Sequence, residues 1–110
     1  MNQDQFDRHL QTCIERTQSI LKTKASEYAH GDRLSNFKDM STMKKETPEK
    51  ALWGVCTKHI IALQDFIDEL DSTQAPRPYS YWQEKTGDII NYMILLEALV
   101  LERVGNEESV

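Results

Sequence analysis

Residues 89–101 read IINYMILLEALVL, a stretch whose apolar side chains cover nearly the whole circumference of a helix. We expect this helix over residues 81–104, between a capping box formed by Ser80 and Gln83 and a stop at Gly105. A helix that is apolar on most sides must be buried on most sides. The need to cover this helix therefore determines how the rest of the chain is arranged.

Two further amphipathic helices are predicted upstream. Over residues 4–25, apolar or small side chains recur at the spacing of one helical face: Phe6, Leu10, Cys13, Ile14, Thr17, Leu21 and Ala25. The next helix begins with Thr47 as N-cap, Pro48 in the first position and Glu49 in the first turn, and we expect it to end near Leu70. The prolines of residues 75–78 cannot continue a helix and separate it from the last one.

The connection between the first two helices is long for a compact domain. Leu34, Phe37 and Met40 recur at three-residue spacing, which predicts a short helix there. The expected fold is therefore a single all-α domain over residues 1–110, with three long helices and a short loop helix. Either a fourth helix or a second copy of the chain must cover the surplus apolar surface of residues 81–104, and we favour a homodimer or higher homo-oligomer that buries Met93, Leu96 and Val100.

Composition excludes several classes of function. The net charge of -5 argues against binding to duplex nucleic acid, which requires clustered Lys and Arg. The longest apolar run, residues 93–96, is far shorter than the roughly 20 residues of a membrane span. Cys13 and Cys56 lie at helical core positions, so we expect two buried, reduced thiols and a cytoplasmic protein.

Glu84, Asp88 and Asn91 are spaced four and three apart, which places them on one narrow stripe of an apolar helix. Burying carboxylates without partners is costly, so this stripe should face a cation or a water-filled pocket. Mg²⁺ suits such a stripe because it prefers carboxylate oxygens together with water and substrate phosphates. The alternative is that Glu84 favours the helix dipole and Asp88 pairs with Lys or Arg.

Two other groups of residues are candidates for ligand binding. On the second long helix, Lys58 projects away from the apolar face and His59 points into it, where a hydrogen-bonded core histidine is the alternative reading. The loop combines aromatic, cationic and amide groups, as a nucleotide site requires. They are Glu27, Tyr28, Asp32, Arg33, Asn36, Phe37 and Lys38. Tyr28 and Phe37 could instead anchor the loop on the core.

Four short motifs, in order and at matching spacing, resemble a known family. They are Lys24-x-x-Glu27-Tyr28, Asp32-x-Leu34-x-Asn36-Phe37, Lys58-His59 and Glu84-x-x-x-Asp88-x-x-Asn91-Tyr92. From about Ile14 to Leu101 the chain resembles nucleotide modification associated domain 1, a family common in bacteriophages. The resemblance implies a phage-encoded all-α protein that binds or acts on nucleotides in the cytoplasm of an infected bacterium.

The layout is also similar to that of the MazG-type all-α nucleotide pyrophosphatases, antiparallel bundles whose carboxylates hold Mg²⁺ and cleave a nucleoside triphosphate to the monophosphate and pyrophosphate. Those enzymes pair an E-x-x-E helix with an E-x-x-D helix, whereas Glu15 here has no second acid three or four residues away. A hydrolytic site would therefore need Glu27, Asp32 or Asp65 beside Glu84 and Asp88.

The resemblance thus implies a nucleotide-binding domain, either a Mg²⁺-dependent pyrophosphohydrolase or a non-catalytic module that sequesters a nucleotide or docks on a host protein. A purely structural helical dimer is the third alternative. The expected catalytic residues are Glu84, Asp88 and Lys58, of which the two acids hold the metal. The expected nucleotide-binding residues are Glu27, Tyr28, Asp32, Arg33, Asn36, Phe37, Lys38, His59 and Asn91.

Overall fold

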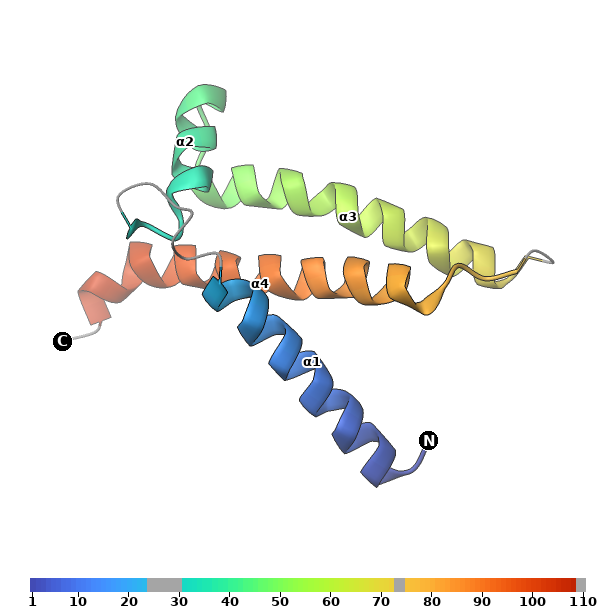
Figure 1. The fold of residues 1–110 in the computed structure, drawn as a ribbon. Helices are drawn as coiled ribbons and strands as arrows, with labels where there is room; N and C mark the ends of the chain where they lie inside the picture. The colour runs from blue at the N-terminus through green and yellow to red at the C-terminus, as the bar shows by residue number, and fades with distance from the viewer. Residues whose placement is uncertain (24–30, 73–74, 109–110) are drawn as a thin grey trace.

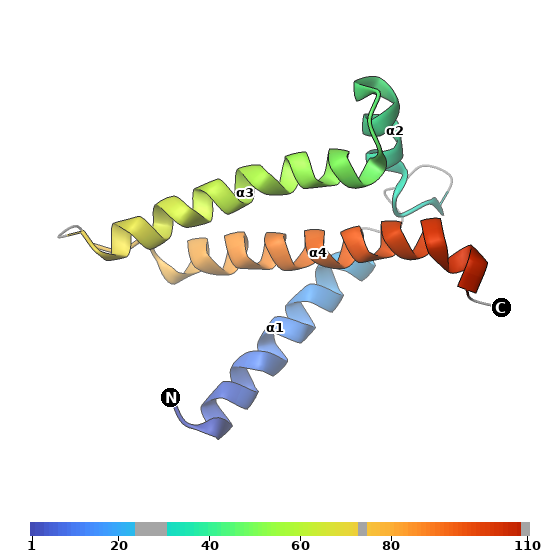
Figure 2. The ribbon, with the colours of Figure 1, turned by 180° about the vertical axis from the view of Figure 1, so that it is seen from behind.

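Four helices make up the part of the chain that the computed structural model describes, residues 1–23, 31–72 and 75–108. They are α1 (Gln3–Thr23), α2 (Ser35–Lys44), α3 (Pro48–Leu70) and α4 (Tyr79–Glu108). The helices α3 and α4 lie side by side, α2 stands across the start of α3, and α1 leaves α4 at an angle (Figure 1). The view from behind shows the same arrangement (Figure 2).

The predicted all-α class is confirmed, because these ranges contain helices and no strand. The short helix predicted in the connection is present as α2. Within the described residues, no helix is both long and apolar enough to cross a bilayer.

Local signals account for the start of α3. The Thr47 hydroxyl accepts a hydrogen bond from the Lys50 amide at 3.3 Å, and Pro48 occupies the first turn. This is the N-cap predicted from the sequence, and it satisfies one of the amides that the first turn leaves without a helical partner. The helix ends at Leu70, as expected.

The start of α2 depends on Asp32 and on burial. Oδ1 of Asp32 accepts a hydrogen bond from the Leu34 amide at 2.9 Å, and the Asp32 carbonyl accepts one from the Ser35 amide at 3.1 Å. Leu34 and Phe37 are both only 7% exposed, which fixes the helix on the core. The helix ends where Lys45 takes a left-handed conformation with φ of 55°.

Both predicted ends of the last helix are wrong. The Tyr81 amide donates to the Pro78 carbonyl at 3.0 Å, so the helix begins at Tyr79 and Ser80 lies inside its first turn rather than at the N-cap. At the other end the helix continues through Gly105 to Glu108. A side chain at Gly105 would come within 2.8 Å of the Leu101 side chain, so this glycine leaves room for Leu101 and does not end the helix.

The hydrophobic core lies where α2, the first half of α3 and the second half of α4 meet. Its buried side chains are Leu34, Phe37, Leu52, Cys56, Leu95 and Leu99. Burial raises the pKa of the Cys56 thiol, so this cysteine stays protonated. Cys13 is also free but only half-buried, with Sγ 3.5 Å from Nε2 of His9, so the expectation of two buried thiols holds for Cys56 alone.

Two bidentate ion pairs hold the ends of the α3–α4 pair. Arg103 donates to both carboxylate oxygens of Glu49 at 2.8 and 2.6 Å. Arg77 donates to both oxygens of Glu69 at 2.7 and 2.9 Å, and its guanidinium lies 4.5 Å from the centre of the Phe66 ring. The hydrogen bonds from Arg103 and Arg77 lower the pKa of Glu49 and Glu69.

Candidate functional site

A polar cluster joins α3 to α4 in the middle of their contact. Nδ1 of His59 on α3 lies 3.6 Å from Oδ2 of Asp88 on α4, and the imidazole centre lies 5.2 Å from the ring centre of Tyr92. The His59 and Asp88 side chains are 23% and 34% exposed, and Nδ1 of His59 is itself shielded from solvent. At 3.6 Å the pair is too long for a hydrogen bond and attracts only when the imidazole is protonated.

The predicted stripe on α4 runs from solvent into the core. Glu84 is exposed, Asp88 one turn later is half-buried, and Asn91 is 8% exposed. An apolar helix that places three polar groups in this order presents a charged outer end and an amide at the inner end. Such a gradient suits a ligand with a charged part outside and a hydrogen-bonding part inside.

Two buried polar atoms of these helices make no hydrogen bond with any described residue. They are Nδ1 of His59 and Oδ1 of Asn91. Most buried polar side-chain atoms in proteins are paired, because an unpaired one costs about 1–3 kcal/mol. Both atoms therefore have hydrogen-bonding capacity left for a ligand.

Three loop residues expected in the nucleotide site have structural contacts. Lys38 lies between two carboxylates, with Nζ 2.7 Å from Oδ2 of Asp32 and 2.5 Å from Oε1 of Glu102. The hydrogen bond from Lys38 lowers the pKa of Asp32, and the bonds to the two acids raise the pKa of Lys38. Phe37 lies in the core with its ring centre 6.5 Å from that of Tyr92, edge to face, as the anchoring alternative predicts.

The remaining predicted residues differ in exposure, and two of them fall outside the described ranges. Lys58 and Asn36 are exposed, and Arg33 is half-buried. Glu27 and Tyr28 fall outside the described residues. Among the residues that are described, no group of three or more His, Cys, Asp or Glu side chains could hold a metal ion. Glu84 and Asp88 thus remain a pair of carboxylates one turn apart.

Tyr92 is the residue of this cluster that the predicted site omits. It touches both His59 and Phe37 through its ring, so it links the polar cluster to the core. The sequence contains a signal for including Tyr92, because this residue follows Asn91 in the last of the four motifs and lies one turn after Asp88.

Comparisons of the chain with protein-family models, with curated proteins and with solved structures found no match.

Proposed function

We propose that this domain binds a nucleotide at the cluster of His59, Asp88, Asn91 and Tyr92, with Mg²⁺ contributing through the phosphates. The observation that carries the proposal is that two buried atoms, His59 Nδ1 and Asn91 Oδ1, make no hydrogen bond with any described residue. Asn91 is the inner end of the acidic stripe, and His59 lies beside Asp88 of the same stripe. The resemblance to nucleotide modification associated domain 1 supports the ligand class. A phage origin and a bacterial cytoplasm belong to the same proposal.

Each group has a chemical role in this proposal. The Asn91 amide reads a polar edge of the base, and the Tyr92 and His59 rings offer flat surfaces beside it. Lys58 and Arg33 supply cations for the phosphates. Phe37, Asp32 and Lys38 support this site by fixing α2 rather than by touching the ligand.

Glu84 and Asp88 are the residues that would hold Mg²⁺. Glu84 is exposed and Asp88 is 34% exposed, which leaves room for the water molecules that Mg²⁺ keeps. When bound, the ion would neutralise phosphate charge beside these acids. Two carboxylates suffice for a phosphate-bridging ion, whereas a two-metal hydrolytic centre needs more, so nucleotide binding is the activity that these residues support best.

A thermal-shift screen of ribo- and deoxyribonucleoside triphosphates, with and without MgCl₂, tests the proposal. A ligand at 100 times its Kd adds about 2.7 kcal/mol of stability, so a binder raises the melting temperature clearly. Chromatography of the same mixtures detects pyrophosphate release and distinguishes a hydrolase from a sequestering module. No shift with any nucleotide would remove the proposal and favour docking on a host protein.

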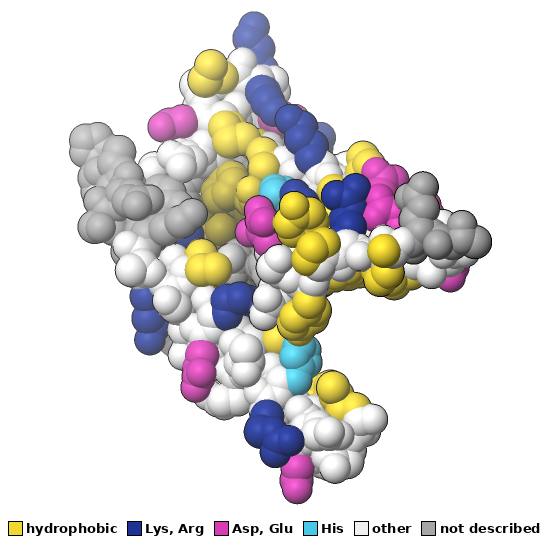
Figure 3. Space-filling view, turned by 45° about the vertical axis from the view of Figure 1, so that its right-hand side comes forward, with side chains coloured by type: hydrophobic (Ala, Val, Ile, Leu, Met, Phe, Trp, Pro, Cys, Tyr) yellow, Lys and Arg dark blue, Asp and Glu magenta, His cyan; other side chains and the backbone are white. Residues whose placement is uncertain are grey.

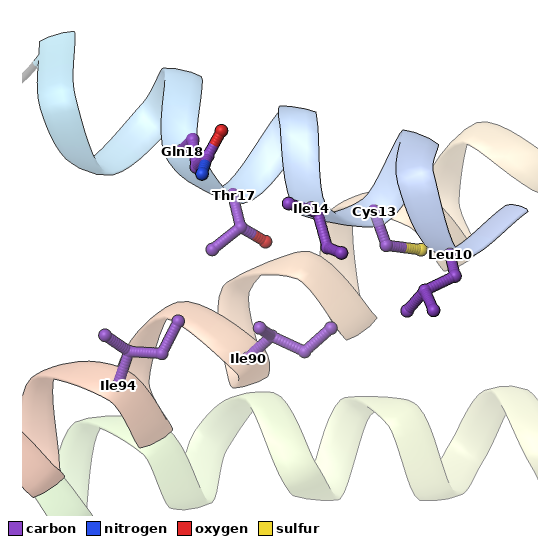
Figure 4. A pocket seen from close by; sticks show the side chains of 7 residues that line it. All are labelled: Leu10, Cys13, Ile14, Thr17, Gln18, Ile90 and Ile94. Carbon is purple, nitrogen blue, oxygen red and sulfur yellow. The ribbon is translucent and has the colours of Figure 1, made fainter. Parts of the chain in front are cut away.

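We also propose that the domain works as a homodimer, in which a second copy covers the apolar groove between α1 and α4. The groove has a volume of about 360 Å³ and is lined mainly by Leu10, Cys13 and Ile14 of α1 and by Ile90 and Ile94 of α4. The close-up shows Ile90 and Ile94 directed towards the α1 side chains across an open gap (Figure 4). The space-filling view shows hydrophobic side chains where the arm that projects downwards meets the rest of the molecule (Figure 3).

The surface area supports a second copy as the occupant. A compact monomer of 12.8 kDa exposes roughly 6,300 Å². This chain exposes 8124 Å², an excess of about 1,800 Å², while a standard interface needs about 800 Å² from each partner. The radius of gyration of 16.8 Å also exceeds the roughly 13 Å of a compact domain of this length.

The helix faces indicate where this contact lies. Thr17 is the buried residue of α1, while Leu10 and Ile14 of its apolar face are 47% and 41% exposed. Of the side chains expected at a dimer contact, Met93 and Val100 are exposed, but Leu96 packs against the core of its own chain. The proposed contact therefore centres on the groove rather than on Leu96.

A further inference from the structure

A second pocket lies at the α1–α4 crossing, next to the apolar groove, with which it shares Cys13 and Ile90. It has a volume of about 300 Å³, and its polar and aromatic lining includes Arg16 from α1 and Tyr79, Trp82, Gln83 and Thr86 from α4. It contains none of the residues of the His59–Asp88 cluster and none of the proposed metal ligands. The pocket is thus separate from the proposed nucleotide site.

Arg16 has no partner for its charge among the described residues. Its Nε atom is shielded from solvent, and Arg16 makes neither a hydrogen bond nor an ion pair with any residue that the structure describes. A guanidinium is always charged, and removing part of it from water without a counter-ion is costly. A group in this state is poised to accept an anion.

Gly87 determines where this guanidinium lies. A Cβ atom at position 87 would meet Nε of Arg16 at 3.2 Å, Cζ at 3.5 Å and Nη2 at 3.6 Å. The guanidinium therefore rests against the backbone of α4 at the one position of that turn without a side chain. A glycine inside a helix lowers stability by about 1 kcal/mol relative to alanine. Gly87 lies where the missing side chain leaves space for the Arg16 guanidinium.

The neighbouring side chains offer hydrogen bonds and a flat surface. Gln83 lies one turn before Gly87, is half-buried, and its amide makes no hydrogen bond with a described residue. Oγ1 of Thr86 donates to the Trp82 carbonyl at 2.7 Å, which leaves its oxygen free to accept. The Trp82 indole is half-buried and held on one side by Phe66, with ring centres 5.6 Å apart.

We propose that this pocket binds a small organic anion with a planar ring, its phosphate or carboxylate group on Arg16 and its ring against Trp82. The fixed cation selects the charge, the Gln83 amide adds a polar contact, and the indole selects a flat group. This proposal stands independently of nucleotide binding at the His59–Asp88 cluster.

Fluorescence titration with phenyl phosphate tests this proposal. Inorganic phosphate, which has the anion without the ring, and phenol, which has the ring without the phosphate, are the comparison ligands. The chain has two tryptophans, so Trp53→Phe leaves Trp82 as the single reporter. We expect phenyl phosphate to change the Trp82 emission and to bind more tightly than inorganic phosphate, while phenol gives no saturable change. An absence of saturable binding by either phosphate probe would overturn the proposal.

Two variants and a matched control locate the site. Arg16→Gln should weaken phenyl phosphate at least about tenfold, because a charge-assisted contact is lost. Arg8→Gln removes the same charge from an exposed position of the same helix and should leave the affinity unchanged. Gly87→Ala should also weaken binding, because its Cβ displaces the guanidinium. If Arg16→Gln and Arg8→Gln lose the same affinity for phenyl phosphate, the loss follows from net charge alone, and the proposal is contradicted.

Ligand-free stability provides the remaining check. Removing an uncompensated cation should leave the urea midpoint of Arg16→Gln equal to that of the parent or higher. A clearly lower midpoint would show that Arg16 has a structural partner, and this also contradicts the proposal.

Discussion

Nδ1 of His59 and Oδ2 of Asp88 lie 3.6 Å apart across the contact of the two longest helices, α3 and α4. The sequence places His59 on an apolar face and Asp88 on an acidic stripe, and the fold brings the two groups together. A half-buried imidazole beside a carboxylate and the Tyr92 ring is the arrangement for which we propose ligand binding. This arrangement leads to the first prediction.

Replacing His59 by Phe should separate binding from stability. Phe keeps a ring beside Tyr92 and removes a buried nitrogen that makes no hydrogen bond with a described residue, so the ligand-free protein should be as stable as the parent or more stable by up to about 1 kcal/mol. Nucleotide affinity should fall. Urea unfolding without ligand measures the first effect. A loss of several kcal/mol would instead identify His59 as a structural hydrogen-bonding residue.

The Glu49–Arg103 pair should contribute to stability above acidic pH. Arg103 lowers the pKa of Glu49 in the folded state below its ordinary value of 4.5. A lowered folded pKa means that the contribution is present above about pH 4.5 and is lost as the pH falls through the folded value. Glu49→Gln should therefore lower the melting temperature at pH 7 and flatten its decline between pH 5 and 3. Asp39→Asn, an exposed acid on α2, is the control and should change neither. A Glu49→Gln profile that runs parallel to that of the parent would contradict the pairing.

If the proposed dimer contact is correct, a single substitution in the groove should change the molecular mass measured in solution. Ile94 lines the groove between α1 and α4 and is 44% exposed in one chain. Ile94→Asp places a charge in an apolar interface and should give a monomer by light scattering at micromolar concentration. Ile61→Asp, on α3 and 54% exposed, should leave the mass unchanged. A parent protein that is already monomeric and stays so on concentration would exclude the contact.

The sequence predicts best the features that a few adjacent residues determine. Thr47 and Pro48 specify the start of α3, and the spacing of Leu34, Phe37 and Met40 specifies α2 because each of these side chains packs on one core. Ser80 and Gly105 mislead because the same local signals occur inside a helix. This helix begins with the hydrogen bond to the Pro78 carbonyl and continues past Gly105, where the missing side chain leaves room for Leu101.

The candidate site could be predicted only along single helices. The Glu84–Asp88–Asn91 stripe follows from helical spacing alone, and the structure adds its gradient of burial. The meeting of His59 with Asp88 depends on the register of α3 against α4, which no local pattern specifies. The same holds for Arg16 and Gly87, which are 71 positions apart in the sequence and meet only because α1 crosses α4 at that point.

Calorimetric titration of Asp88→Asn tests the central claim most directly. The titrant is the nucleoside triphosphate that gives the largest thermal shift, in the presence of MgCl₂, and Asp68→Asn on the exposed side of α3 is the matched control. Because Asp88 is one-third exposed, its pairing with His59 contributes at most about 1 kcal/mol, and the ligand-free melts of all three proteins should nearly coincide. We predict an affinity at least about tenfold weaker for Asp88→Asn and unchanged for Asp68→Asn. A large drop in the ligand-free melting temperature of Asp88→Asn, with unchanged affinity per folded molecule, would make Asp88 a structural residue and contradict the account.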